Sequence, residues 1–379
     1  MRILRHCLCP LAVLLAVACT QTPAPDTTTA AVPGRAVQSD EARLQPVWQA
    51  LDANKDGTVL LTELQPLMFF SLKPHDANGD GAISLREYVE FDLDPNREGQ
   101  IPLGENVRLI ANLDYAGTGD PRQALDIYLP KTPSVSGPLP VLAYVHGGGW
   151  SIGSKIMGRD QTMGIANSGR YAVISIGYRL SWQDPWPAQI DDAKAAIRWI
   201  RANAKQYGLD PNRICAMGVS AGGQIVAKLG LTNGIAENEG KVGHNLAQSS
   251  AVNCVVSEAS PTDMRPVPAG TPGIDAFLAG PDRAEAGRSA SPILDVKAGA
   301  PPFLIIHGNK DPIVPYQLAV EFDAALRAAG VRVFFQTVDG GGHGGFTKVW
   351  PAINERIRLF LERNLYDPST QVPTDTLKM

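Results

Sequence analysis

The chain has 379 residues, of which 44% are hydrophobic and 19% charged, as expected of a folded globular protein with a sizeable core. Its 34 Lys and Arg residues stand against 38 Asp and Glu residues, so the formal net charge is -4. Proteins that bind phosphate backbones carry an excess of basic residues. We therefore expect no nucleic-acid partner.

Residues 1–18 have the pattern of an export signal. Arg2 and Arg5 precede the apolar stretch 8–18, which is too short to span a bilayer. Residues 16–18 fit a small-residue cleavage site, which would release a secreted protein. An export signal means that we expect the working protein to lie outside the cytoplasm.

A second interpretation makes Cys19 a lipidation site. Residues 15–19 are similar to a bacterial lipobox, although Ala16 stands where that pattern prefers Leu. Residues 19–39 are rich in Thr, Pro and Ala, so they form a tether that cannot bury enough surface to fold. The tether favours a lipoprotein anchored in a bacterial membrane, periplasmic or at the cell surface, over a freely secreted protein.

Residues 40–105 contain an internal repeat of two acidic segments, 52–63 and 76–87, that resemble EF-hand calcium loops. Ca²⁺ prefers hard oxygen ligands, which such loops supply from three side chains, one backbone carbonyl and a final bidentate Glu. Gly57 and Gly81 allow the sharp turn, and Val59 and Ile83 stand where paired loops form a short β contact. The predicted ligands are Asp52, Asn54, Asp56, Thr58 and Glu63 in the first loop and Asp76, Asn78, Asp80, Ala82 and Glu87 in the second.

The spacing of the two loops predicts a small, compact helical module. Only residues 64–75 separate them, which leaves room for one short shared helix, as in the abbreviated calcium modules of extracellular bacterial proteins. Residues 94–105 keep the ligand spacing and the turn glycine, but Pro102 and Gly104 disturb the exit. The sequence is compatible with two interpretations of this segment, a degenerate third calcium loop and a linker turn.

From residue 106 to 365 the chain alternates between β-rich and helical segments, which predicts an α/β domain with a mostly parallel sheet covered by helices. Residues 187–207 place Ile190, Ala193, Ile197 and Ile200 at helical spacing, with a proline in the first turn. Residues 366–379 follow as a C-terminal tail. The predicted strands are 123–129, 141–145, 172–178, 214–219, 252–257, 303–307 and 331–338.

Ser220 is the candidate nucleophile. It stands in Gly218-Val219-Ser220-Ala221-Gly222-Gly223, between a predicted strand and a helix over residues 224–231. Such a strand-to-helix turn needs small flanking residues and lifts the serine hydroxyl above the carboxyl edge of the sheet. The motif alone is a weak signal, so its setting in the chain matters more.

Three other loops complete the predicted site. His146-Gly147-Gly148-Gly149-Trp150 follows the strand 141–145, and the backbone N–H groups of Gly148, Gly149 and Ala221 are candidates for an oxyanion hole. Asp311 follows the strand 303–307, and His343 lies in a glycine loop after the strand 331–338. The order Ser, Asp, His is that of α/β hydrolases.

The competing assignments are weaker. Asp263 is the main rival for the acid, but it comes too early for that order, and a structural or substrate-contact role suits it better. His146 is expected to brace the glycine loop, and His307 lies four residues before Asp311. Cys215 and Cys254 lie in predicted strands, and the sequence allows either a disulfide between them or two buried free thiols.

The catalytic motifs, together with Tyr178-Arg179-Leu180 and Pro187-Ala188-Gln189, resemble the esterase and lipase branch of the α/β-hydrolase superfamily, and within it the bacterial feruloyl and acetyl xylan esterase group. The resemblance implies ester hydrolysis through an acyl-serine intermediate, with no cofactor for catalysis. The implied substrates are small acyl esters or acetyl and feruloyl esters of plant polysaccharides. Ser181 to Asp184 replaces the Ala-Pro-Glu of hormone-sensitive-lipase relatives, which argues against that subgroup.

Two other functions remain as alternatives. One is a calcium-dependent binding or adhesion protein on an inactive hydrolase scaffold, against which the complete triad argues. The other is a serine peptidase of the prolyl-oligopeptidase type, which would not predict the His-Gly-Gly-Gly loop at residues 146–149.

Overall fold

The computed structural model describes residues 103–270 and 272–379, together with 41–42, 45, 48–49, 52, 55–60, 76 and 78–93. The predicted signal, the tether, Cys19, Asn54, Glu63 and residues 94–102 lie outside the described residues. The chain divides into two units, Met1–Ala30 and Ala31–Met379, and everything described belongs to the second. Within that described part, no helix is both long and apolar enough to cross a membrane.

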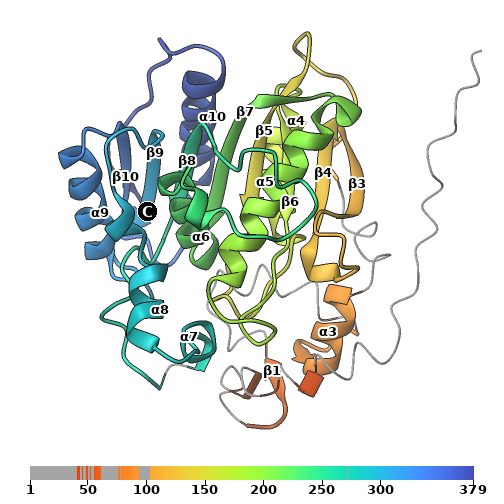
Figure 1. The fold of residues 1–379 in the computed structure, drawn as a ribbon, viewed down its shortest axis with the longest axis vertical. Helices are drawn as coiled ribbons and strands as arrows, with labels where there is room; N and C mark the ends of the chain where they lie inside the picture. The colour runs from red at the N-terminus through yellow and green to blue at the C-terminus, as the bar shows by residue number, and fades with distance from the viewer. Residues whose placement is uncertain are drawn as a thin grey trace, which may run out of the picture. The chain divides into compact units, whose positions relative to one another are not determined.

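A nine-stranded sheet forms the centre of the second unit (Figure 1). Strands β6, β5, β7, β8, β9 and β10 run parallel to one another, whereas β4 pairs antiparallel with β6 and β3 pairs antiparallel with β4. In spatial order the strands are β11 (Leu377–Lys378), β10 (Val333–Asp339), β9 (Phe303–Gly308), β8 (Cys254–Glu258), β7 (Leu209–Val219), β5 (Leu139–Val145), β6 (Ala172–Ile176), β4 (Ala124–Pro130) and β3 (Val107–Asp114).

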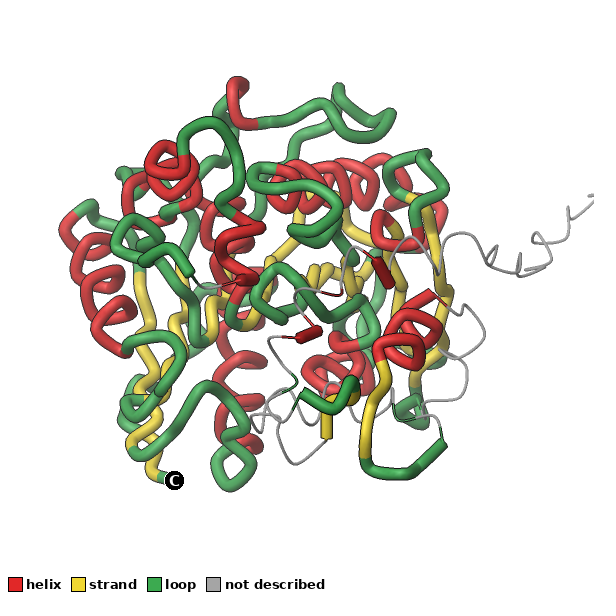
Figure 2. Tube along the Cα trace, turned by 90° about the horizontal axis from the view of Figure 1, so that it is seen from below, coloured by secondary structure: helices red, strands yellow, loops and turns green. Residues whose placement is uncertain are grey.

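Helices cover both faces of the sheet, as the view in Figure 2 shows. Apolar residues of α5, α6 and α9 pack on one face, and those of α4 and α10 pack on the other. The helices are α4 (Met157–Asn167), α5 (Ala188–Tyr207), α6 (Ala221–Leu231), α7 (Pro272–Phe277), α8 (Arg283–Ala290), α9 (Tyr316–Ala328) and α10 (Trp350–Leu365), with short 3-10 turns η4 (Pro121–Gln123), η5 (Ala236–Asn238) and η6 (Pro292–Asp295).

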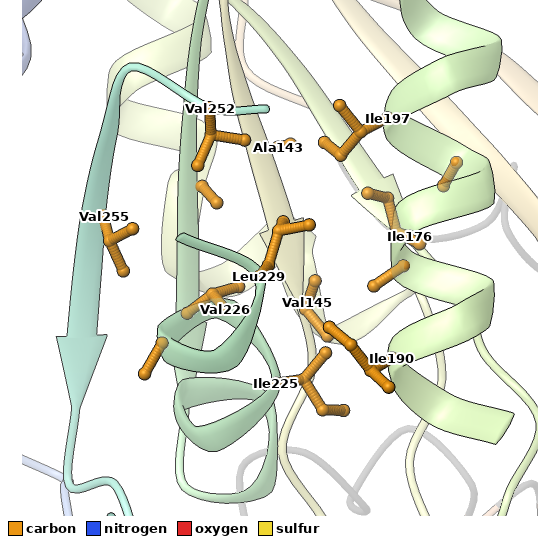
Figure 3. Packing of buried hydrophobic residues seen from close by; sticks show 14 of the residues in the cluster. Ala143, Val145, Ile176, Ile190, Ile197, Ile225, Val226, Leu229, Val252 and Val255 are labelled. Atoms are coloured by element: carbon orange, nitrogen blue, oxygen red, sulfur yellow. The ribbon is translucent and has the colours of Figure 1, made fainter. Parts of the chain in front are cut away.

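The central strands are apolar on both faces because helices cover both. In β5, Ala143 and Val145 belong to the core beneath α5 and α6, while Leu142 and Tyr144 belong to the core beneath α10. Figure 3 shows α5 and α6 directing their isoleucine, valine and leucine side chains at the first of these cores. The predicted face of the helix 187–207 is confirmed, since Ile190, Ala193, Ile197 and Ile200 are all buried.

The predicted strands all form, with boundaries shifted by a few residues, and the α/β architecture is confirmed. Two edge strands were not predicted. β3 pairs with β4 and is only half-buried, so it lacks the continuous apolar run that marked the inner strands. Residues 366–379 also differ from the expected tail, because Leu377 and Lys378 pair with Val338 and Asp339 of β10.

Cys215 and Cys254 are joined by a disulfide, which settles the alternative left open by the sequence. The two cysteines lie directly opposite each other on the parallel strands β7 and β8, with their Cα atoms 4.7 Å apart. Both are fully buried on the face that α10 covers. The bridge therefore cross-links two neighbouring strands at the centre of the sheet.

In the N-terminal part, the short strands β1 (Thr58–Leu60) and β2 (Ala82–Ser84) pair antiparallel, and α3 (Leu85–Leu93) follows β2 directly. Val59 lies opposite Ile83, and both side chains are fully buried. The β contact expected at these two residues is therefore present.

A buried charge network holds the segment that links β6 to α5. The Asp192 carboxylate is fully buried and accepts hydrogen bonds from the Arg179 guanidinium at 2.8 Å and from Gln123 Nε2 at 2.7 Å. The Gln189 side-chain amide donates to the carbonyl oxygens of Arg179 and Asp184. The two motifs that carried part of the family resemblance thus meet at one loop.

We expect Arg179→Ala to lower the free energy of unfolding by roughly 3 kcal/mol or more, because it leaves the Asp192 carboxylate buried without its cation. Urea unfolding followed by circular dichroism measures the change. The control is Arg358→Ala, which removes an exposed ion pair with Glu355 and should cost less than about 1 kcal/mol. Equal losses in the two variants would contradict the prediction.

Candidate active site

Ser220 occupies a sharp turn between β7 and α6. Its backbone has φ 56° and ψ -120°, a conformation that L-residues rarely adopt. The Ser220 N–H donates to the Glu258 carbonyl at 2.8 Å, and Gln224 N–H donates to the Ser220 carbonyl at 3.1 Å. A side chain at Gly218 would collide with the Gly222 backbone, and one at Gly222 with the Val145 carbonyl. The turn therefore requires glycine at both flanking positions.

The three predicted triad residues come together in one hydrogen-bonded chain. His343 Nε2 lies 2.9 Å from Ser220 Oγ, and His343 Nδ1 lies 2.7 Å from Asp311 Oδ2. Because the carboxylate can only accept, Nδ1 carries a proton and Nε2 of the neutral ring is free to accept from the serine hydroxyl. This is the arrangement that activates a serine nucleophile.

Asp311 is held as an anion in a buried position. Burial opposes its ionisation, but hydrogen bonds from His307 and His343 and from the backbone hold the pKa of the Asp311 carboxyl well below its usual range. The backbone N–H groups of Ile313 and Val314 donate to Oδ1 at 2.8 and 2.9 Å. The Asp311 carboxyl is therefore ionised at neutral pH.

His307 is a site residue whose role the sequence did not reveal. Its Nε2 lies 3.1 Å from Asp311 Oδ2 and 3.0 Å from the Val314 carbonyl oxygen. Both partners are acceptors, so Nε2–H is the donor and the neutral ring is sufficient. Its position four residues before Asp311 was visible, but the chain leaves β9 in a turn, and only the fold shows that this turn brings the ring back to the carboxylate.

The glycine loop after β5 lies beside the nucleophile. A Cβ built on Gly147 would stand 3.4 Å from Ser220 Cβ and 2.9 Å from the Val219 carbonyl oxygen. Gly148 and Gly149 have φ values of 108° and 56°, and Ser151 N–H and Ile152 N–H both donate to the Gly148 carbonyl at 3.0 Å. Ala221 begins α6 directly after Ser220. Gly147 thus lies beside Ser220, and the predicted oxyanion-hole residues follow directly in the chain, Gly148 and Gly149 after Gly147 and Ala221 after Ser220.

The rival residues have other partners. Asp263 forms hydrogen bonds with Arg265 and Ser291. His146 is buried, stacks on Tyr178 with ring centroids 4.2 Å apart, and donates through Nδ1 to the Gly147 carbonyl at 2.7 Å. His146 therefore braces the loop, as expected.

An aromatic cluster attaches the segment of α7 and α8 to the glycine loop. Phe277 is fully buried between Trp150, with ring centroids 4.1 Å apart, and Trp186, at 5.5 Å. The Trp186 N–H donates to the Phe277 carbonyl, and its indole Nε1–H donates to Ser289 Oγ. No periodic pattern in the sequence predicts this contact, because Phe277 is the single aromatic residue within residues 266–290.

The two predicted calcium loops share a turn geometry. Asp52 Oδ2 accepts from Gly57 N–H at 2.8 Å, and Asp76 Oδ2 accepts from Gly81 N–H at 3.0 Å, which is the same step in each loop. Glu87 Oε2 accepts from the backbone and hydroxyl of Ser84. Among the residues that the structure describes, no group of three or more His, Cys, Asp or Glu side chains is placed to hold a metal ion.

Comparison with known proteins places the chain in a family. The sheet topology and the hydrogen-bonded chain of Ser220, His343 and Asp311 are those of an α/β hydrolase. The BD-FAE family model matches residues 125–326, more than half of the chain, and the protein belongs to that family. A second model, described as TAP-like protein, matches residues 284–371.

Named relatives are esterases. Esterase LipC of Mycobacterium tuberculosis is 36% identical over 239 residues, which cover 59% of this chain and 57% of LipC. Esterase LipQ of the same organism is 34% identical over 226 residues, covering 56% of this chain and 52% of LipQ. The match thus spans little more than half the length of these relatives.

Solved structures agree with this placement. A truncated form of a carbohydrate esterase from gut microbiota is similar with a TM-score of 0.63 and 31% identity, covering 70% of this chain and 99% of that one. An esterase from Thermogutta terrifontis has a TM-score of 0.57 at 22% identity, with 70% of this chain and 96% of that one covered. The second likeness supports the fold alone.

Glu258, the last residue of β8, makes stability depend on pH. Burial raises the pKa of its carboxyl from 4.5 to about 7, and its Oε2 has no hydrogen-bond partner among the described residues. The unfolded chain releases this proton near pH 4.5 and the folded chain near pH 7, so stability falls as pH rises between these values.

We expect the free energy of unfolding of the wild type to decrease, relative to Glu258→Gln, by roughly 3 kcal/mol between pH 4.5 and pH 8. Gln has the same shape and does not titrate, so the difference isolates one group. Urea unfolding of both proteins across this range measures it. Parallel pH profiles for the two proteins would show that Glu258 does not titrate as described.

Proposed function

We propose that the protein is an exported serine carboxylic-ester hydrolase that works through an acyl-serine intermediate. The observation that carries the proposal is the hydrogen-bonded chain from Ser220 through His343 to Asp311, beside a glycine loop. Membership of the BD-FAE family supports it.

The proposed reaction uses each residue at the atom the geometry presents. His343 Nε2 takes the proton of Ser220 Oγ as that oxygen attacks the ester carbonyl. The N–H groups of Gly148, Gly149 and Ala221 stabilise the negative oxygen of the tetrahedral intermediate. His343 then donates its proton to the leaving alcohol. In the second half, His343 takes a proton from water as the water attacks the acyl carbonyl, and returns it to Ser220 Oγ as the carboxylic acid is released. Asp311 stabilises the imidazolium form of His343 throughout.

The proposed substrates are acyl esters of carbohydrates, such as acetyl or feruloyl groups on plant polysaccharides, or small acyl esters. Support comes from the similarity to the carbohydrate esterase from gut microbiota, which covers almost all of that chain. Export and the Cys19 lipid anchor are part of the proposal, because a polysaccharide substrate lies outside the cell. The Cys215–Cys254 disulfide suits the same compartment.

We expect Ser220→Ala to abolish turnover of p-nitrophenyl acetate, and Asp311→Asn to lower kcat by roughly 10⁴-fold, because the wrong His343 tautomer then faces the serine. Asp263→Asn, whose carboxylate pairs with Arg265, is the control and should retain wild-type turnover. Stopped and continuous absorbance assays measure these rates, and a panel of acetyl, butyryl, longer acyl and feruloyl esters then ranks the substrates.

Two results would contradict the proposal. Equal rates for the wild type and Ser220→Ala would exclude the acyl-serine mechanism. Peptide cleavage without ester turnover would favour a peptidase of the prolyl-oligopeptidase type.

We also propose that the paired N-terminal loops bind Ca²⁺ as a structural ion. The recurring Asp turn and the β1–β2 pairing fit such loops. In the second loop the ligands would be the side chains of Asp76, Asn78, Asp80 and Glu87 and the Ala82 carbonyl, and in the first Asp52, Asn54, Asp56, Thr58 and Glu63. A bound Ca²⁺ would cross-link each loop electrostatically and would take no part in ester chemistry.

We expect calcium to raise the melting temperature with a dissociation constant on the order of 10⁻⁴ to 10⁻³ M, as in extracellular modules. At a hundredfold excess over that constant the gain is about 2.7 kcal/mol. Scanning calorimetry in calcium and in EDTA measures it, and Asp76→Ala should reduce the shift. Loss of ester turnover in EDTA with the fold intact would contradict a purely structural role.

A further inference from the structure

Tyr88 connects the N-terminal module to the loop that lies beside Ser220. It is the fourth residue of α3, directly after the predicted ligand Glu87, and its side chain is fully buried. Its ring packs against Trp48, which is 1% exposed, with ring centroids 5.4 Å apart. Its hydroxyl oxygen accepts a hydrogen bond of 2.7 Å from the buried backbone N–H of Gly153. This contact spans 65 residues of sequence.

Gly153 is held on both sides of its backbone. Its N–H donates to Tyr88, and its carbonyl accepts from Arg122 Nη1 at 2.9 Å in a buried hydrogen bond. Its φ is 94°, and a Cβ there would stand 2.7 Å from His146 Nδ1 and 2.8 Å from the Gly147 carbonyl oxygen. The backbone at Gly153 therefore packs directly on the start of the glycine loop.

The loop from Gly147 to Gly153 carries the proposed oxyanion hole. Gly147 stands next to Ser220, and the Gly148 carbonyl accepts from Ser151 and Ile152 N–H groups. Residues 147–153 thus form a closed turn whose end is anchored by Tyr88. An N–H group stabilises the oxyanion only when it already points at the developing charge. A shift of Gly153 would therefore change the direction of the N–H groups in this loop.

We propose that Tyr88 is a positioning residue for the oxyanion loop, acting through Gly153. This inference rests on the proposed function, since it assigns Tyr88 to the same site. The phenol oxygen supplies the acceptor for a buried N–H group, and a buried donor without an acceptor favours conformations in which it reaches water. Without Tyr88 Oη, the turn 147–153 opens more often and its N–H groups are no longer held in place.

The test is Tyr88→Phe, which keeps the ring against Trp48 and removes only the hydroxyl. We expect kcat for p-nitrophenyl acetate to fall about tenfold with KM within about twofold, less than the roughly hundredfold cost of deleting an oxyanion donor itself. Tyr171→Phe is the matched control, because it removes the hydroxyl of another buried tyrosine, which lies directly before β6 and is bonded to Glu362. It should leave kcat unchanged.

Hydrogen exchange gives a readout that does not depend on activity. Peptides covering residues 146–153 should exchange faster in Tyr88→Phe than in the wild type and in Tyr171→Phe, with peptides of β5 and α6 unchanged. Exchange at the wild-type rate, or an unchanged kcat, would overturn the role of Tyr88. A folded wild type without ester turnover would overturn the proposed function instead, and the exchange rates alone would then decide whether Tyr88 anchors the loop.

Discussion

The backbone turn at Ser220 is the constraint on which the site depends. A serine at φ 56° and ψ -120° is in a strained conformation, and such residues persist only where the surroundings hold them. Here the restraints are hydrogen bonds to Glu258 and Gln224 and the close approach of Gly218 and Gly222 to neighbouring backbone. The turn directs Ser220 Oγ toward His343 Nε2, so any change that relaxes it removes the nucleophile from its base.

The parallel sheet brings the other residues of the site to Ser220. Strands β5, β7, β9 and β10 run in one direction, so the loops that follow them emerge at one edge. The glycine loop, Ser220, Asp311 and His343 each follow one of these strands. Residues separated by 123 positions, such as Ser220 and His343, come within 2.9 Å for that reason. Asp311 in turn depends on His307, which lies within β9 itself.

Most of this site could be predicted because it follows from chain order. Apolar runs marked the inner strands, and Ser220, Asp311 and His343 each came at the end of one, in the order this fold uses. The contact of His307 with Asp311 and that of Phe277 with Trp150 could not be predicted, because each depends on how a loop turns back in space. The edge strands β3 and β11 were missed for a related reason. Their half-exposed residues lack an apolar run, and only pairing with β4 and β10 defines them.

The Cys215–Cys254 bridge illustrates a further limit. The sequence placed both cysteines in strands but could not show that these strands are neighbours in register. Pairing partners in a parallel sheet are set by the crossover helices that connect them, here α6 between β7 and β8. The local sequence pattern therefore predicts that a strand forms, but not which strand lies beside it in the sheet.

The Tyr88–Gly153 hydrogen bond also bears on where the domain boundary lies. The alternating strand pattern begins near residue 106, yet a buried side chain from α3 accepts a hydrogen bond from the end of the loop beside the nucleophile. A gene fragment cut at the apparent boundary would encode every catalytic residue while omitting part of their support. If the N-terminal segment were exchanged for that of another hydrolase, the new segment would have to supply a hydroxyl acceptor for the Gly153 N–H.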